Sequence, residues 1–364
     1  MSYRYIDTQE GFDAFIKERA DAQVKEVAVD LEADSLHNYG ESLCLIQYAD
    51  HEVSAIIDPL AFEDISAIKE FVESRVLWMH GSDYDMSLFR RNLDWMPMNT
   101  LDSQVAARLL GVKKFGLANL LEQFLGLEVS KSNQKEDWSK RPLPQDMIDY
   151  ALTDVNHLIE LAHLLVDQLK EKNRYEWFVE SCLWQQEKIA ERPCVKEDPW
   201  RINGAGKLKR KGLHFLKYIW EWRDQVAEKL NRPSFKVVGN KPMLEWAKIL
   251  QDGRELELPK YVRSWQREQL LASLEMAKAM PASSYPNLEK KIRIRKAPGA
   301  EELVKSLLDS RDKVAESLEV ESMILGSRAA YEAIVYKGEA LEEHFMRWQI
   351  DLLDFKPLFE FRNA

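Results

Sequence analysis

Cysteine is scarce in this chain of 364 residues, and its three cysteines, Cys44, Cys182 and Cys194, form no Cys-x-x-Cys or Cys/His pattern. This scarcity excludes a disulfide framework and argues against a structural zinc site, so we expect a reducing compartment. No run approaches the roughly 18 apolar residues that a membrane span requires, and the N-terminus lacks a basic segment followed by an apolar one. We therefore predict a cytoplasmic protein.

An overall excess of positive charge is missing as well, because the formal net charge is -10. The two halves of the chain differ, however. Residues 1–190 contain 19 Lys and Arg against 34 Asp and Glu, whereas residues 191–364 contain 32 against 27. The length predicts two or three domains, and the charge asymmetry favours a division of labour between them. Surfaces that only keep two domains soluble would produce the same asymmetry.

Short runs rich in Val and Ile in the first half predict a mixed sheet flanked by helices. Strands are predicted at 24–34, 43–49, 53–58 and 75–79. The short connections between the first three strands favour antiparallel pairing. Helical periodicity is present at 61–73, 83–93, 103–111, 116–126 and 144–171.

The second half is helical and repeats itself. RDQVAEKL (223–230) and RDKVAESL (311–318) are offset by 88 residues, which predicts two copies of one helical module of about 80 residues. Two basic clusters, KLKRK (207–211) and KKIRIRK (290–296), accompany them. Such clusters can contact a polyanion or can simply be a solvated face.

Four acidic residues and one tyrosine could carry chemistry. Asp30 and Glu32 alternate on a strand, so both carboxylates leave the same face and repel each other unless a cation lies between them. Asp85 lies at the start of a helix, and Tyr150 stands four residues before Asp154, on one face of a later helix. Each of these patterns also occurs in proteins without a cation site.

Together the patterns reproduce the three motifs of the DEDD exonucleases, in the variant with a tyrosine, and the chain resembles ribonuclease D. The segments that carry this resemblance are LCLIQYAD (43–50), IIDPL (56–60), HGSDYDMSLF (80–89), LDSQVAARLLG (101–111), LANLLEQFLG (117–126), KSNQKEDWSKRPL (131–143) and YALTD (150–154). In the second half, EWRDQVAEKLNRPSFKVVGN (221–240) resembles an HRDC domain.

The resemblance implies a fold and a domain order. An α/β ribonuclease H-like exonuclease domain is expected over 1–190, followed by a linker over 191–206. Two all-α domains are expected after it: an HRDC domain over 207–286 and an HRDC-like domain over 297–364.

The resemblance also implies the site. Asp30, Glu32, Asp85 and Asp154 would bind two divalent cations, Mg²⁺ or Mn²⁺, and Tyr150 would orient the attacking water. Carboxylate oxygens suit such hard cations, and two of them about 3.5 to 4 Å apart can stabilise the attacking and leaving oxygens of a phosphodiester. Candidate contacts to RNA are His37, Tyr39, His80, Tyr84, Trp138, Lys140 and Arg141. For Trp138, a packed loop anchor is the alternative role.

The implied function is that of a metal-dependent 3′–5′ exoribonuclease that releases 5′-mononucleotides. It would trim single-stranded 3′ ends of tRNA precursors and other structured RNAs, as a monomer without a membrane partner. Alternatives are a 3′–5′ exonuclease acting on DNA, a nucleic-acid-binding protein with a weak nuclease site, and helical repeats that bind proteins. A decayed nuclease site should have lost at least one of the five residues, and all five are present.

Overall fold

A computed structural model describes residues 3–129, 135–288 and 296–363 of the chain. The chain divides into two compact units. The larger unit comprises Met1–Ala33, Leu43–Arg192 and Arg293–Ala364, and the smaller unit comprises Asp34–Ser42 and Pro193–Ile292.

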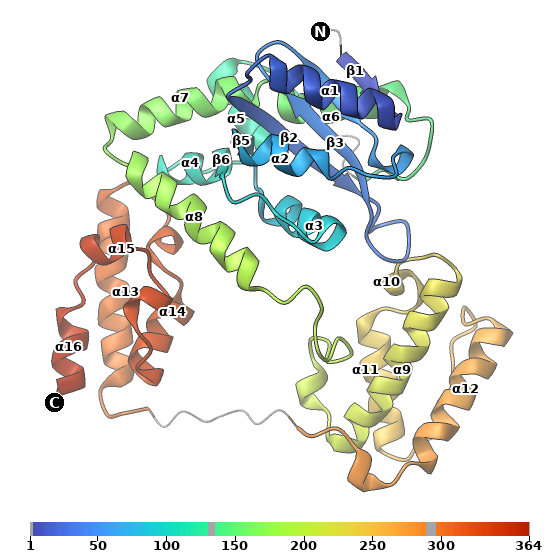
Figure 1. Cartoon of the computed structure of the whole chain (residues 1–364). Coiled ribbons are helices and arrows are strands. Elements are labelled where there is room, and N and C mark those ends of the chain that lie inside the picture. Colours follow the sequence, from blue (N-terminus) through green and yellow to red (C-terminus); the bar gives the residue numbers. More distant parts are fainter. Residues whose placement is uncertain (1–2, 130–134, 289–295, 364) are drawn as a thin grey trace. The chain divides into compact units, whose positions relative to one another are not determined.

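In the described part of the chain, six strands of the larger unit form one mixed sheet in the order β1-β4-β3-β2-β5-β6 (Figure 1). The strands are β1 (Tyr3–Ile6), β2 (Glu26–Ala33), β3 (Leu43–Ala49), β4 (Ser54–Ile57), β5 (Val76–Met79) and β6 (Thr100–Asp102). Strand β3 is antiparallel to both β2 and β4, which confirms the expected pairing. β1 is parallel to β4, and β5 is parallel to β2 and β6. The sequence pattern does not indicate the two short edge strands, β1 and β6.

The helices of the larger unit lie before, between and after these strands (Figure 1). They are α1 (Gln9–Asp21), α2 (Ala67–Glu73), α3 (Asp83–Leu93), α4 (Ser103–Leu109), α5 (Leu117–Leu120), α6 (Gln145–Asn156), α7 (Leu158–Glu171), α8 (Tyr175–Glu191), α13 (Ala300–Ser317), α14 (Arg328–Glu332), α15 (Arg347–Leu352) and α16 (Lys356–Asn363). A π-helical turn, Leu121–Leu125, continues α5.

Two of the predicted helices differ from the structure. The continuous helix expected over 144–171 is interrupted at His157, where φ is -117° and ψ is 6°, so that α6 and α7 are separate. The helix expected over 61–73 begins only at Ala67. Before it, the side chain of Asp64 accepts hydrogen bonds from the backbone N–H and the hydroxyl of Ser66, at 2.8 and 2.9 Å. Such local bonds compete with the helix.

Each face of the sheet packs against its own helices, because side chains alternate along a strand. On one face, Val27 and Val29 of β2 join a core formed with α1, α2 and α3. On the other face, Leu45 of β3 packs against α6, and this face also carries Asp30 and Glu32. The acidic residues of β2 therefore point toward α6.

The smaller unit is helical, with α9 (Arg210–Lys229), α10 (Ser234–Val237), α11 (Asn240–Gln251) and α12 (Ser264–Ala279) around a core that includes Trp222 and Trp246. The loop between β2 and β3 belongs to this unit. Within it, the hydroxyl of Tyr39 donates to Asp224 of α9 at 2.9 Å, and the backbone N–H of Tyr39 donates to Asn231.

The C-terminal helices pack against the exonuclease part of the larger unit, in one shared core. Gly111 makes the closest approach: its φ is +84°, and a Cβ there would lie 2.1 Å from the carbonyl oxygen of Glu319. Beside it, the guanidinium of Arg174 donates to the carbonyl of Leu109 at 2.7 Å and to that of Leu318 at 2.8 Å. A glycine and a buried arginine thus bring the two segments together.

The predicted internal repeat has a counterpart in hydrogen bonding. In the first copy, Arg223 of α9 donates to the carbonyl of Val238 at 3.3 Å. In the second, Arg311 of α13 donates to the carbonyl of Gly326 at 2.9 Å. Both donors and both acceptors are 88 residues apart, so the repeated sequence makes the same contact within each helical module.

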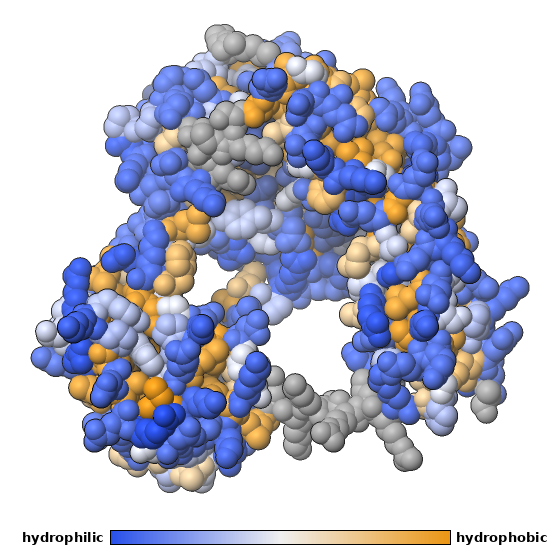
Figure 2. Space-filling model, turned by 180° about the vertical axis from the view of Figure 1, so that it is seen from behind, coloured by the Kyte–Doolittle hydropathy of each residue, from blue (hydrophilic) through white to orange (hydrophobic). Residues whose placement is uncertain are grey.

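On the face shown in Figure 2, hydrophobic surface is broken up by hydrophilic residues over both units. Among the described residues, no helix is long and apolar enough to cross a membrane.

Candidate active site

Strand β2 places two carboxylates near its carboxyl end. Asp30 and Glu32 are two residues apart and share the face that packs against α6. Strand β5 runs parallel to β2, so the turn that follows β5 reaches the same edge of the sheet. Carboxyl ends of neighbouring strands are a frequent place for ligand binding in α/β proteins.

Helix α6 brings a third carboxylate to this pair. Asp154 lies one turn after Tyr150 on α6, and the hydroxyl of Tyr150 donates a hydrogen bond to it. One carboxylate oxygen from each of Asp30, Glu32 and Asp154 lies within 4.8 Å of the others. Three oxygens at this separation could hold a hard divalent cation.

Asp85 approaches the cluster from the first turn of α3. Its side chain is buried, and its charge acts on Asp30 and Glu32. Asp83, in the same turn, forms an ion pair with Arg192 at 2.8 Å. Of the two first-turn acids, only Asp85 therefore belongs to the carboxylate cluster.

Asp102, which sequence reasoning missed, holds the turn before α3. Its buried carboxylate accepts from the backbone N–H groups of Gly81 and Ser82, at 2.9 and 2.8 Å, and from the Ser82 hydroxyl at 2.9 Å. It also caps α4 by accepting from the N–H of Gln104 at 2.8 Å. Because this turn leads into α3, Asp102 determines where Asp85 enters the site. The available sequence signal was only an Asp at a predicted helix start.

Burial raises the pKa of all four clustered carboxyl groups, and mutual repulsion adds to it. The pKa of Glu32 rises to about 9, that of Asp85 to about 8 and that of Asp154 to about 7. The pKa of Asp30 lies well above its usual value, with burial as the largest cause and Asp85 as the next. The hydrogen bond from Tyr150 opposes the rise at Asp154. A cation among such groups would favour their ionised forms.

Trp138 is a packed residue next to the site. Its side chain is 1% exposed, and its ring centroid lies 6.2 Å from that of Tyr150. This placement agrees with the loop-anchor alternative and not with an open stacking surface. The first residues of the surrounding motif, 131–134, lie outside the described residues.

Arg141 is engaged inside the protein and does not face solvent with its whole guanidinium. It pairs with Asp58 and donates to the carbonyls of Cys44 at 2.8 Å and Trp138 at 2.7 Å. Lys140 is exposed, with its Nζ 3.5 Å from a carboxylate oxygen of Asp137. A phosphate contact by either residue stays a prediction.

The remaining predicted contacts lie in different places. Nδ1 of His80 is 2.8 Å from the Ser103 hydroxyl, and burial lowers the pKa of His80, which keeps the imidazole neutral. Tyr84 is 44% exposed on α3. His37 and Tyr39 belong to the smaller unit, and the hydroxyl of Tyr39 is bonded there as described above.

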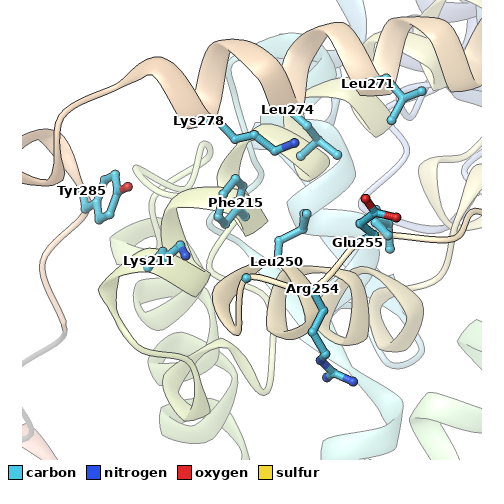
Figure 3. A pocket seen from close by; sticks show the side chains of 11 residues that line it. Lys211, Phe215, Leu250, Arg254, Glu255, Leu271, Leu274, Lys278 and Tyr285 are labelled. Carbon is cyan, nitrogen blue, oxygen red and sulfur yellow. The ribbon is translucent and has the colours of Figure 1, made fainter.

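The smaller unit has a groove of about 610 Å³ between α9, the end of α11 and α12 (Figure 3). Its lining includes three buried apolar side chains, Phe215, Leu250 and Leu274. Two cations, Lys211 and Lys278, line it as well, and Lys211 is the last residue of the basic KLKRK cluster.

Comparison with known proteins agrees with this picture. A family described as 3'-5' exonuclease matches residues 3–170. Ribonuclease D of Zymomonas mobilis is 30% identical over 329 residues, which cover 83% of this chain and 83% of that one. Ribonuclease D of Escherichia coli is 25% identical over 336 residues, covering 90% of this chain and 88% of that one.

The crystal structure of Escherichia coli RNase D, described as an exoribonuclease involved in structured RNA processing, is similar in fold. It has a TM-score of 0.74 at 23% identity and covers 97% of this chain and 98% of that chain.

The matching family and the mixed sheet define the class of protein, a 3′–5′ exonuclease with an acidic site. The relatives that match over most of the chain are more specific: the chain belongs to the ribonuclease D family and is a 3′–5′ exoribonuclease. This exonuclease family is metal-dependent, and the acidic cluster is the candidate metal site.

Proposed function

We propose that the chain removes nucleotides from RNA 3′ ends by hydrolysis with two divalent cations, and releases 5′-mononucleotides. Asp30, Glu32, Asp85 and Asp154 would hold the cations. The observation that carries this proposal is the approach of three carboxylates from β2 and α6 to within 4.8 Å of one another. The ligands would all be carboxylate oxygens, which favours Mg²⁺ or Mn²⁺ over zinc.

When bound, the cations would stabilise charge on the attacking and leaving oxygens of the phosphodiester. The chain's own residues would fix the geometry. Burial, followed by the charge of Asp154, raises the pKa of Tyr150, so its hydroxyl keeps its proton and serves as a hydrogen-bond donor and acceptor. We propose that Tyr150 orients the water for in-line attack. Trp138, packed against its ring, would restrict the positions that Tyr150 can take.

We further propose that the two helical modules are HRDC-like and hold structured RNA, such as tRNA precursors, upstream of the cut. Supporting this are the excess of Lys and Arg after residue 190 and the repeated contacts of Arg223 and Arg311. The groove that contains Lys211 and Lys278 is a candidate contact. If these lysines bind phosphates, replacing both with Glu should weaken RNA binding and reduce its salt dependence by about two phosphate contacts.

A time course on 5′-labelled single-stranded RNA, with Mg²⁺, Mn²⁺ or EDTA, tests the chemistry. We expect a shortening ladder that requires metal and is reduced by orders of magnitude in Asp154→Asn. Tyr150→Phe should lose about 100-fold, the size of effect that misplacing a reactant causes. Asp149→Asn, on the exposed side of the same helix, is the matched control and should cleave normally.

Two outcomes would contradict parts of the proposal. Equal digestion of a matched DNA oligonucleotide would favour the alternative of a general nucleic-acid exonuclease. Cleavage that survives both EDTA and Asp154→Asn would remove the carboxylate cluster from the reaction.

A further inference from the structure

A buried glutamine lies next to the proposed metal site. Gln47 is in β3, all of whose residues are buried, and its side chain is 0% exposed. Neither Oε1 nor Nε2 of Gln47 has a hydrogen-bond partner among the described residues. Buried amides are nearly always hydrogen-bonded, and an amide that is not destabilises the fold. A neutral apolar side chain would fill this place at less cost, so the amide calls for a functional reason.

The register of the sheet identifies its neighbours. Gln47 is directly opposite Asp30 in the antiparallel pair of β2 and β3, and directly opposite Ile56 on its other side. Residues opposite each other in such a pair have Cβ atoms about 4.5–5.5 Å apart and share one face. Asp30 is therefore the polar side chain beside Gln47 in the sheet.

Other groups on this face leave Asp30 as the partner of choice. Leu45, two residues before Gln47, is apolar and packs against α6. The polar pair farther along the face, Ser54 and Asn156, is already joined by a hydrogen bond of 2.6 Å. A glutamine amide on three rotatable bonds can reach a carboxylate on the neighbouring strand by a change of side-chain torsion alone.

We infer that Gln47 is a positioning residue: its Nε2 donates a hydrogen bond to the carboxylate of Asp30 when Asp30 binds a cation. This inference rests on the proposed function. A carboxylate that binds a metal commonly has its second oxygen fixed by a donor, and loss of such a donor typically lowers metal affinity 10–100-fold. Gln47 can supply this donor from the strand next to Asp30.

The test compares Gln47→Met with Ile56→Leu. Met matches the shape of Gln without the amide, while Ile56→Leu alters packing on the other side of Gln47 without changing a polar group. Mn²⁺ binding would be measured by calorimetry, and unfolding of the metal-free protein by urea. We expect Gln47→Met to bind Mn²⁺ 10–100-fold more weakly, with an unchanged or higher urea midpoint. High Mn²⁺ should restore its cleavage rate. Ile56→Leu should bind Mn²⁺ within twofold of the wild-type protein.

Other results would overturn the inference in distinguishable ways. Mn²⁺ affinity of Gln47→Met within twofold of wild type would assign Gln47 a packing role only, while the proposed metal site stands. Equal losses of affinity in both variants would point to general disruption of the sheet. Absence of Mn²⁺ binding by the wild-type protein would overturn both the proposed metal site and the role of Gln47.

Discussion

The indole rings of Trp177 and Trp348 stack on each other, with centroids 4.9 Å apart and planes inclined by 12°. Trp177 is on α8 and Trp348 is on α15, so the contact joins the C-terminal helices to the exonuclease part of the larger unit. Nearby, the carboxylate of Glu180 accepts from the backbone N–H of Arg347 at 2.5 Å. These contacts explain why the C-terminal helices share a core with α8.

Trp177→Ala should therefore loosen the C-terminal helices. We expect a loss of about 2–3 kcal/mol, less than for a fully buried Trp because Trp177 is half-buried. Hydrogen exchange should be faster across residues 300–363 than in the wild-type protein. Trp184→Ala is the matched control, since Trp184 lies on the same helix and contacts Lys188. Equal acceleration in both variants would contradict a specific role of the stacked pair.

The raised carboxyl pKa values predict a pH dependence of stability. The pKa values of Glu32, Asp85 and Asp154 are about 9, 8 and 7, all above those of an unfolded chain. The folded protein then binds more protons than the unfolded chain, so in EDTA its stability should fall as pH rises from about 5 to 9. We expect the Tm to fall by several degrees, and Mg²⁺ to raise Tm more at pH 8 than at pH 6.

Asp154→Asn removes one titrating group from the cluster and should flatten the pH profile in EDTA. A wild-type Tm in EDTA that is constant or rises between pH 6 and 9, with no difference from the variant, would contradict this account of the cluster.

Asp102 should matter for both folding and cleavage. Asp102→Asn turns an NH₂ group toward backbone N–H donors of the turn before α3, and we expect a loss of about 1–3 kcal/mol. Cleavage should fall as well, because Asp85 follows that turn. Asp83→Asn removes only an exposed ion pair and should change stability by about 1 kcal/mol or less. Urea unfolding and the RNA assay on both variants would check this; similar effects would remove the special role of Asp102.

Arg141 distinguishes an anchor from a phosphate contact. As an anchor for Trp138, its replacement by Ala should lower stability and kcat through Tyr150, and leave the salt dependence of RNA binding unchanged. As a phosphate contact, its replacement should raise KM and reduce the salt slope by about one. The bonds of Arg141 to Asp58 and the Cys44 carbonyl favour the anchor. Binding measured at several salt concentrations decides between the two.

Local patterns in the sequence were enough to predict much of the sheet and the members of the candidate site. Alternation placed Asp30 and Glu32 on one face, and helical spacing placed Tyr150 and Asp154 one turn apart, because both depend on backbone geometry within a few residues. The antiparallel pairing of β3 followed from short connections. That these residues bind metal stays a prediction.

Tertiary structure decided what depends on contacts between distant segments. The register that sets Gln47 opposite Asp30, the burial of Trp138 and the internal bonds of Arg141 each depend on which strands and loops meet in space. The edge strands β1 and β6 are too short to produce a pattern of their own, and they form because neighbours offer hydrogen bonds. Periodicity reports only which face of a segment is apolar, whereas the partner of that face is settled when the whole chain folds.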